Sequence, residues 1–166
     1  MNDSAVGHAG IATPLGTMRL VTDGRAILEL EFDTPAIAAT PLSFAAQNLA
    51  DAVTRRLDAY FAGERIAFDF PLAPSGTPFQ QSVWSALCGI PYGETVSYAE
   101  IARRVGRPSA VRAVGAANGA NPIAIVIPCH RVIGTNGTLT GYGGGLDRKR
   151  ALLLLEAPAP FARFAA

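Results

Sequence analysis

The first third of the chain breaks into short apolar runs that turn residues separate. Three short strands are predicted, at 11–13, 18–21 and 26–32, with Pro-Leu-Gly and Asp-Gly turns between them. Residues 1–10 show no periodicity, so we expect no regular structure there. The pattern therefore predicts a small β-sheet built from hairpins.

The next apolar pattern has the spacing of a helix. It lies before Gly63, a residue typical of a helix end, and polar side chains occupy its other faces. A loop is predicted before it at 33–42, and one more strand after it at Ile66–Phe70. The apolar positions of this amphipathic helix are Leu49, Val53, Leu57, Tyr60 and Phe61.

Residues 71–78 contain three prolines and a glycine, which is typical of a linker. They separate a strand-rich N-terminal part from a mostly helical C-terminal part. We therefore predict an α+β protein with two domains, at 1–74 and 75–160.

Helix-start signals are sharper after the linker. Thr77-Pro78-Phe79-Gln80 and Ser97-Tyr98-Ala99-Glu100 both have the form of a capping box. Short helices at 98–106 and 110–118, joined by a turn, match a helix-turn-helix. A last helix is predicted at 146–156, and we expect the tail after Pro158 and Pro160 to be frayed.

An uncharged run, Ile123–Ile127, leads directly into Pro128, Cys129, His130 and Arg131. Its length and its β-branched residues predict a fully buried strand that Pro128 ends. Basic neighbours favour the thiolate form of cysteine, so Cys129 is a candidate nucleophile. The alternative is a buried structural cysteine beside a surface His-Arg pair.

The helix at 110–118 is almost free of bulky side chains, and Arg112 projects from it as one long cation. Small residues let another surface approach the backbone closely. Either this face lies in a nucleic-acid groove, or the helix packs on the core and Arg112 reaches solvent. Further on, Gly134–Gly145 holds six glycines and Tyr142, a loop that could wall a pocket.

The composition of the chain bears on its core, its partners and its cellular compartment. Of the 166 residues 49% are hydrophobic and 16% charged, which allows a good core, and the net charge of +1 does not advertise nucleic-acid binding. Cys88 and Cys129 could form one disulfide, but without a secretory signal we expect a reduced, cytoplasmic protein. His8 and His130 add too few ligands for a zinc site, and no apolar run is long enough to span a membrane.

The motif Pro128-Cys129-His130-Arg131-Val132, preceded by Asn121-Pro122 and Arg112-Ala113-Val114-Gly115, resembles the O6-alkylguanine-DNA alkyltransferase family. The resemblance runs from about Phe79 to Glu156. It implies a ribonuclease-H-like N-terminal domain and a helix-turn-helix domain that carries the reactive cysteine. It also implies repair of O6-methylguanine and, less efficiently, O4-methylthymine in DNA, without a cofactor.

By the same resemblance, Cys129 accepts the alkyl group irreversibly, one lesion per molecule. His130 would act as its base through a water, and Glu156 would orient His130. Asn121 would tie the helix-turn-helix to the segment that carries Cys129, and Tyr98 would donate a proton or hydrogen bond to the departing guanine. The upstream part has no cysteines, so it does not resemble the metal-binding regulatory module of some relatives.

The resemblance further implies a monomer that binds double-stranded DNA in the minor groove and rotates the damaged nucleotide out of the stack. Arg112 would fill the space that the nucleotide leaves. The DNA contacts implied are Arg112, Tyr98, Ser97, Ala113 and Ala116. The base pocket implied is formed by Val132, Tyr142, Gly143 and Gly144; some relatives have a hydroxyl residue in place of Gly143.

Three alternatives differ from this prediction. A Cys-His hydrolase would need an oxyanion hole near Cys129 and would turn over. A helix-turn-helix DNA-binding module would carry Cys129 only as a structural residue. A lesion-binding relative would recognise the damaged base without transfer.

Overall fold

The computed structural model describes residues 6–33 and 40–165 of the chain. The chain divides into two compact units, Met1–Ser75 and Gly76–Ala166, which are described separately. Residues 1–5, and residues 34–39 of the loop predicted at 33–42, lie outside the described residues. Small antiparallel strands in the first unit and helices in both make this an α+β fold, as predicted.

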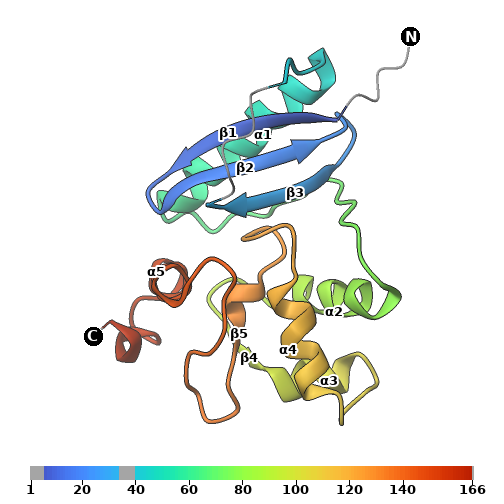
Figure 1. Cartoon of the computed structure of the whole chain (residues 1–166). Coiled ribbons are helices and arrows are strands. Elements are labelled where there is room, and N and C mark those ends of the chain that lie inside the picture. Colours follow the sequence, from blue (N-terminus) through green and yellow to red (C-terminus); the bar gives the residue numbers. More distant parts are fainter. Residues whose placement is uncertain (1–5, 34–39, 166) are drawn as a thin grey trace. The chain divides into compact units, whose positions relative to one another are not determined.

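The first unit contains a three-stranded antiparallel sheet in the order β1-β2-β3 (Figure 1). Its strands are β1 (Gly7–Thr13), β2 (Gly16–Thr22) and β3 (Ile27–Phe32). Asp23 Oδ1 accepts the backbone N–H groups of Arg25 and Ala26, both at 2.9 Å, and so closes the predicted Asp-Gly turn. The expectation of no regular structure at 1–10 was wrong from Gly7 onward, because β1 pairs along its whole length with β2.

Helix α1 (Phe44–Phe61) packs against one face of this sheet. The Ser43 hydroxyl caps it by accepting the Ala46 N–H at 3.2 Å. Its buried positions include Val53, Leu57 and Tyr60, as its periodicity predicts. The strand predicted at Ile66–Phe70 was wrong: the edge of β3 is met instead by Leu72, which forms a parallel bridge with Ile27.

The second unit is mostly helical. Thr77 and Gln80 form the predicted capping box of α2 (Pro78–Cys88). The helix-turn-helix consists of α3 (Tyr98–Arg104) and α4 (Val111–Gly119). Trp84 Nε1 on α2 donates to the Ala117 carbonyl on α4 at 2.8 Å, which fixes the two helices against each other.

Ser97 caps α3 by accepting the Glu100 N–H at 3.1 Å, as predicted. The Glu100 carboxylate pairs with Arg103 and Arg104 on the same helix, so only the Ser97 half of the predicted box is formed. A two-stranded parallel sheet of β4 (Val96–Ser97) and β5 (Val132–Ile133) joins the start of α3 to the region after Cys129.

The strand predicted at Ile123–Ile127 was wrong, although the burial predicted for this run is confirmed for Ile123, Ile125, Val126 and Ile127. The segment is a buried turn. Ile127 N–H donates to the Ile123 carbonyl at 3.0 Å, and Ile125 has a φ of 70°. Positive φ strains a β-branched residue, so surrounding contacts must hold it.

The Asn121 side chain provides these contacts. Its Oδ1 accepts the Ile123 N–H at 3.0 Å, and its Nδ2 donates to the Ile127 carbonyl at 2.8 Å. Backbone groups that a strand would pair with a neighbour are thus satisfied by one amide. The result is a compact turn that ends beside Cys129.

Helix α5 (Leu146–Glu156) is the last long helix, and a short 3-10 helix, η2 (Ala162–Phe164), follows it. The tail is not frayed as expected. Phe161 is buried against Ile133 and Leu153, so an apolar contact holds the chain beyond the prolines.

Candidate active site

Cys129 begins a 3-10 helix, η1 (Cys129–Arg131), directly after Pro128, and its thiol is free. Only 5% of the residue is exposed. Burial raises the pKa of the Cys129 thiol, while the Asn121 side chain, the charge of Lys149 and backbone N–H groups lower it to a lesser extent. Desolvation thus outweighs the positive charge that favours the thiolate, and the pKa lies above its ordinary value. A base is needed to activate this group.

His130 is fully buried next to Cys129 in the chain. Its Nε2 lies 2.7 Å from Glu156 Oε1. Burial, together with the charges of Arg131 and Lys149, lowers the pKa of His130 more than Glu156 raises it, so the neutral imidazole is favoured. An ionised carboxylate can only accept, so Nε2 carries the proton and Nδ1 is an acceptor. Nδ1 is buried and has no hydrogen-bond partner within the described part of the chain.

Glu156 ends α5 and brings its carboxylate to His130 from the far end of the sequence. Burial alone would raise the pKa of Glu156. Hydrogen bonds from His130 and Arg131, and their charges, outweigh this and hold the pKa well below its usual range. The carboxylate is therefore ionised and fixed in the interior.

Arg131, predicted only as a basic neighbour of Cys129, belongs to this cluster as a partner of Glu156. Its Nε and Nη2 donate to the two carboxylate oxygens of Glu156, both at 2.9 Å. A bidentate pair of this kind fixes the plane of the carboxylate. The position of Arg131 within the Pro-Cys-His-Arg run, directly after an apolar stretch, was the available signal.

Lys149 is the second charged residue that sequence reasoning missed. It is fully buried on α5, and its Nζ donates to the carbonyls of Val132, Thr140 and Gly141. Burial lowers its pKa to about 8. Lys149, Leu152, Leu153 and Glu156 recur at i, i+3, i+4 and i+7, so helical spacing could have placed both charges on the buried face.

Tyr98, the first residue of α3, is half-buried, and its hydroxyl donates to the Thr140 carbonyl at 2.8 Å. Burial raises the pKa of the Tyr98 hydroxyl. Lys149 Nζ lies 5.7 Å from the centroid of its ring, and both residues bind the same carbonyl. The structure thus brings Tyr98 to the glycine-rich loop and to the buried lysine.

The predicted pocket residues lie on two segments. Val132 is fully buried directly after η1. Tyr142 is half-buried with a buried hydroxyl, and burial raises its pKa well above 10, with a further contribution from nearby Cys129. Gly143 lies so close to the end of α4 that an added Cβ would be 3.5 Å from the Gly119 carbonyl. Gly144 is half-buried beside it.

Three of the predicted DNA contacts, Arg112, Ala113 and Ala116, lie exposed on α4, a helix that also contacts the catalytic cluster. The other end of the same helix reaches that cluster, because Asn118 Nδ2 donates to the Cys129 carbonyl at 3.3 Å. Ser97 is half-buried at the start of α3. Helix α4 thus links an exposed face of small residues to the reactive thiol.

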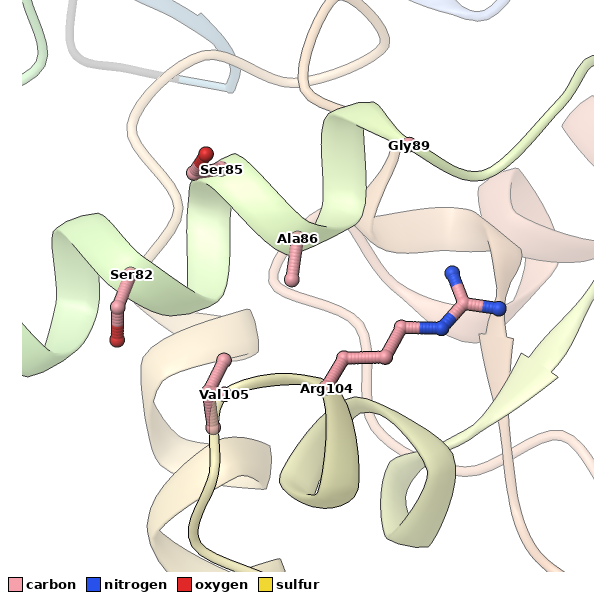
Figure 2. Close-up of a pocket in the computed structure, with 6 residues that line it drawn as sticks. All are labelled: Ser82, Ser85, Ala86, Gly89, Arg104 and Val105. Carbon is pink, nitrogen blue, oxygen red and sulfur yellow. The ribbon is translucent and has the colours of Figure 1, made fainter.

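A shallow groove of about 540 Å³ lies between α2 and the end of α3, as Figure 2 shows. Its lining includes no histidine, lysine or carboxylate that could activate the hydroxyls of Ser82 and Ser85, and its cation, Arg104, is paired with Glu100. The lining residues are Ser82, Ser85, Ala86, Gly89, Arg104 and Val105. The chemistry is therefore at Cys129 and not in this groove.

Among the described residues no cluster of His, Cys, Asp or Glu could hold a metal ion. No helix among them is long and apolar enough to cross a membrane.

This fold and this site define a class of protein: a helix-turn-helix domain with a buried cysteine and a histidine-glutamate pair. Residues 78–158 match the 6-O-methylguanine DNA methyltransferase DNA-binding domain, and residues 8–74 match the ribonuclease-like domain of the same family. The chain belongs to the 6-O-methylguanine DNA methyltransferase family.

Similar proteins agree with this. The methylated-DNA–protein-cysteine methyltransferase of Mycobacterium tuberculosis is 51% identical over 162 residues, 93% of this chain and 96% of the relative. That of Methanosarcina acetivorans is 65% identical over 103 residues, 62% of this chain and 66% of the relative. The crystal structure of Mycobacterium tuberculosis OGT in complex with DNA is 49% identical, with a TM-score of 0.80, and covers 96% of this chain and 99% of that one.

Proposed function

We propose that this protein repairs alkylated DNA by moving the alkyl group of O6-methylguanine, and more slowly that of O4-methylthymine, onto Cys129. The buried thiol beside the neutral His130 and ionised Glu156 is the observation that carries the proposal. The class of reaction follows from family membership and from relatives of 51–65% identity that are named methylated-DNA–protein-cysteine methyltransferases.

The transfer begins with removal of the thiol proton. His130 Nδ1 takes it through one bridging water, and Glu156 stabilises the imidazolium that forms. The thiolate attacks the methyl carbon, an S–C bond forms, and the C–O6 bond breaks with its electrons on the base. The departing guanine then takes up a proton, with the Tyr98 hydroxyl as the proposed donor of a proton or hydrogen bond. The thioether is stable, so each molecule acts once.

The proposed partner is double-stranded DNA, bound through α4 in the minor groove. Ala113 and Ala116 present a smooth face without base-reading groups, which suits repair in any sequence context. Because Cys129 is almost fully buried, the nucleotide must leave the stack, and Arg112 would fill its place. Tyr98 and Ser97 would complete the contact to DNA, and Val132, Tyr142, Gly143 and Gly144 the base pocket.

The two compact units support domains at 1–74 and 75–160, of which the second would carry the reaction. We further propose that the protein acts as a monomer. A reaction that needs a free thiol suits the reducing cytoplasm, and both cysteines are free.

The test is a duplex that carries O6-methylguanine with an isotopic label in the methyl group. We expect one label per protein molecule, on the peptide that contains Cys129, and none with Cys129→Ala. Cys88→Ala is the matched control and should transfer normally. Label on Cys88, turnover beyond one per molecule, or no transfer by folded protein would overturn the proposal.

A further inference from the structure

Arg131 places a permanent cation in the interior of the candidate active site. Its Nε and Nη2 donate to Glu156, and its Nη1 donates to the Ile90 carbonyl at 2.7 Å. Its guanidinium carbon lies 5.7 Å from the centroid of the Tyr92 ring. Each nitrogen of the guanidinium is therefore used, and the side chain has a single orientation.

Glu156 is held equally firmly. Oε1 accepts from His130 Nε2 and from Arg131 Nη2, while Oε2 accepts from Arg131 Nε and from the Gly93 N–H at 3.2 Å. Each oxygen thus accepts from Arg131 and from at least one other donor. The carboxylate cannot rotate away from His130 without losing bonds to Arg131.

We propose that Arg131 is a positioning residue of the transfer reaction: it keeps Glu156 ionised and immobile, so that His130 stays neutral and its Nδ1 remains free to take the thiol proton. This inference rests on the proposed function of the same site. Arg131 touches neither the lesion nor the thiol, and it acts through Glu156.

A charge count explains why this cation matters. With neutral His130, the group of Arg131, Glu156 and His130 has a net charge of zero. Without Arg131 the same group carries one buried negative charge, and uptake of a proton would neutralise it. A proton already bound to His130 or Glu156 occupies the base before the thiol can use it. Arg131 therefore lowers the pH above which the base is available.

Other charged or titratable groups face this cluster from neighbouring elements. Lys149 on α5 adds a positive charge, Cys129 on η1 is the proton donor, and the Tyr142 hydroxyl lies in the glycine-rich loop. Arg131 itself faces the Tyr92 ring and the thiol of Cys88 on α2, whose pKa burial raises and the charge of Arg131 lowers to a lesser extent. None of them replaces Arg131, because Lys149 binds backbone carbonyls rather than Glu156. The charge of Arg131 also lowers the pKa of His130, which agrees with the expectation that loss of Arg131 favours proton uptake by His130.

The experiment compares single-turnover transfer rates from pH 5 to 9 for the wild type, Arg131→Met and Arg131→Lys. In Arg131→Met the acid limb should move to higher pH by roughly one unit or more, so that its deficit grows as the pH falls. In Arg131→Lys the charge is kept, so the limb should stay within a few tenths of a unit while the rate drops. Arg163→Met, at an exposed arginine of η2, is the control and should match the wild type.

A second measurement needs no DNA. Iodoacetamide capture of Cys129, measured by peptide mass spectrometry in a Cys88→Ala background and normalised to a cysteine-free peptide of the same chain, should show the same shift in its acid limb. Cys88 is removed because the pKa of that thiol, which burial raises, is also lowered by the charge of Arg131. If the wild type transfers no methyl group but the capture limb shifts, the proposed function fails, while the effect of Arg131 on Glu156 and on the base of Cys129 is supported. If both variants lose rate equally at every pH, or if the limb of Arg131→Met coincides with the wild type, Arg131 is only structural and the inference is overturned.

Discussion

The two units of this protein bury different kinds of side chain. Among the described residues, the first unit buries one polar side chain, Thr22, whose hydroxyl serves a local turn. The second unit buries six: Asn118, Asn121, His130, Arg131, Lys149 and Glu156. Burial of a polar or charged group costs free energy unless partners compensate for it. The described core of the first unit is thus almost wholly apolar, whereas the second unit bears the cost of burying polar and charged groups around one thiol.

Glu156→Gln should break this contrast most strongly. It leaves Arg131 buried without its counter-ion, so we expect a loss of about 3–5 kcal/mol in unfolding free energy. It also removes the carboxylate from His130, and transfer should slow by roughly 100-fold or more. Chemical denaturation and single-turnover transfer measure the two effects.

The matched control for Glu156→Gln is Leu57→Ala in the apolar core of the first unit. It should lose about 2–5 kcal/mol while the transfer rate stays near that of the wild type. The low pKa of Glu156 adds stability above its unfolded value of 4.5 that disappears as the pH falls toward the folded value. Glu156→Gln should lack this acid sensitivity. Equal acid sensitivity in both proteins would contradict the assignment of an ionised Glu156.

Lys149→Met tests the second buried charge through pH. The pKa of Lys149 is about 8 in the folded protein and 10.5 when unfolded, so the unfolded chain binds the extra proton between these values. The stability of the wild type relative to Lys149→Met should therefore rise between pH 8 and 10.5, by up to about 3 kcal/mol. Urea denaturation at a series of pH values measures it. A constant difference would mean that Lys149 titrates normally.

Arg112→Ala should affect reactivity without affecting either core. Arg112 is exposed, so the unfolding free energy should change by less than about 0.5 kcal/mol. Repair in duplex DNA should slow by roughly 10- to 100-fold, because the extruded nucleotide loses its replacement in the stack. Reaction with a free O6-alkylguanine base should hardly change. Equal slowing on both substrates would exclude the proposed role of Arg112.

Removal of helix caps should have the smallest effects on unfolding free energy and on transfer rate, and these effects should be alike in the two units. Ser43→Ala in the first unit and Thr77→Ala in the second each remove one capping hydroxyl. Each should cost about 1 kcal/mol and leave the transfer rate unchanged. A rate effect of Thr77→Ala alone would show that the start of α2 communicates with the active site.

The sequence predicted correctly those elements that contacts between residues close together in the chain determine. Thr77, Pro78 and Gln80 marked the start of α2, and the Asp-Gly turn marked a hairpin, because each contact spans only a few residues. The strand predicted at Ile123–Ile127 was wrong because the side-chain amide of Asn121, just before this run, binds its backbone into a turn, and the apolar pattern does not reveal those bonds. The burial of Lys149 was not predicted because a cation is expected at the surface. Only the backbone carbonyls that accept from its Nζ in the folded protein compensate for its burial.

For the site, the Pro-Cys-His-Arg-Val motif pointed to Cys129 and His130, and the structure places Glu156 beside them. The direction of the Cys129 pKa could not come from neighbours in sequence. It depends on desolvation, which only the packed structure determines. For the same reason the sequence could not reveal that Arg131 faces inward to Glu156.

Asn121 has a consequence for how this protein can vary. Its side chain makes the backbone hydrogen bonds that a neighbouring strand would otherwise make with the turn before Cys129. It also lowers the pKa of the thiol. A substitution there changes the shape of the backbone and the acidity of the nucleophile at once. Even Asp, which keeps the acceptor, loses the donor that binds the Ile127 carbonyl and adds a negative charge beside the thiol. The backbone of the turn and the pKa of the Cys129 thiol thus depend on the same side-chain amide, and a substitution of Asn121 cannot change one without the other.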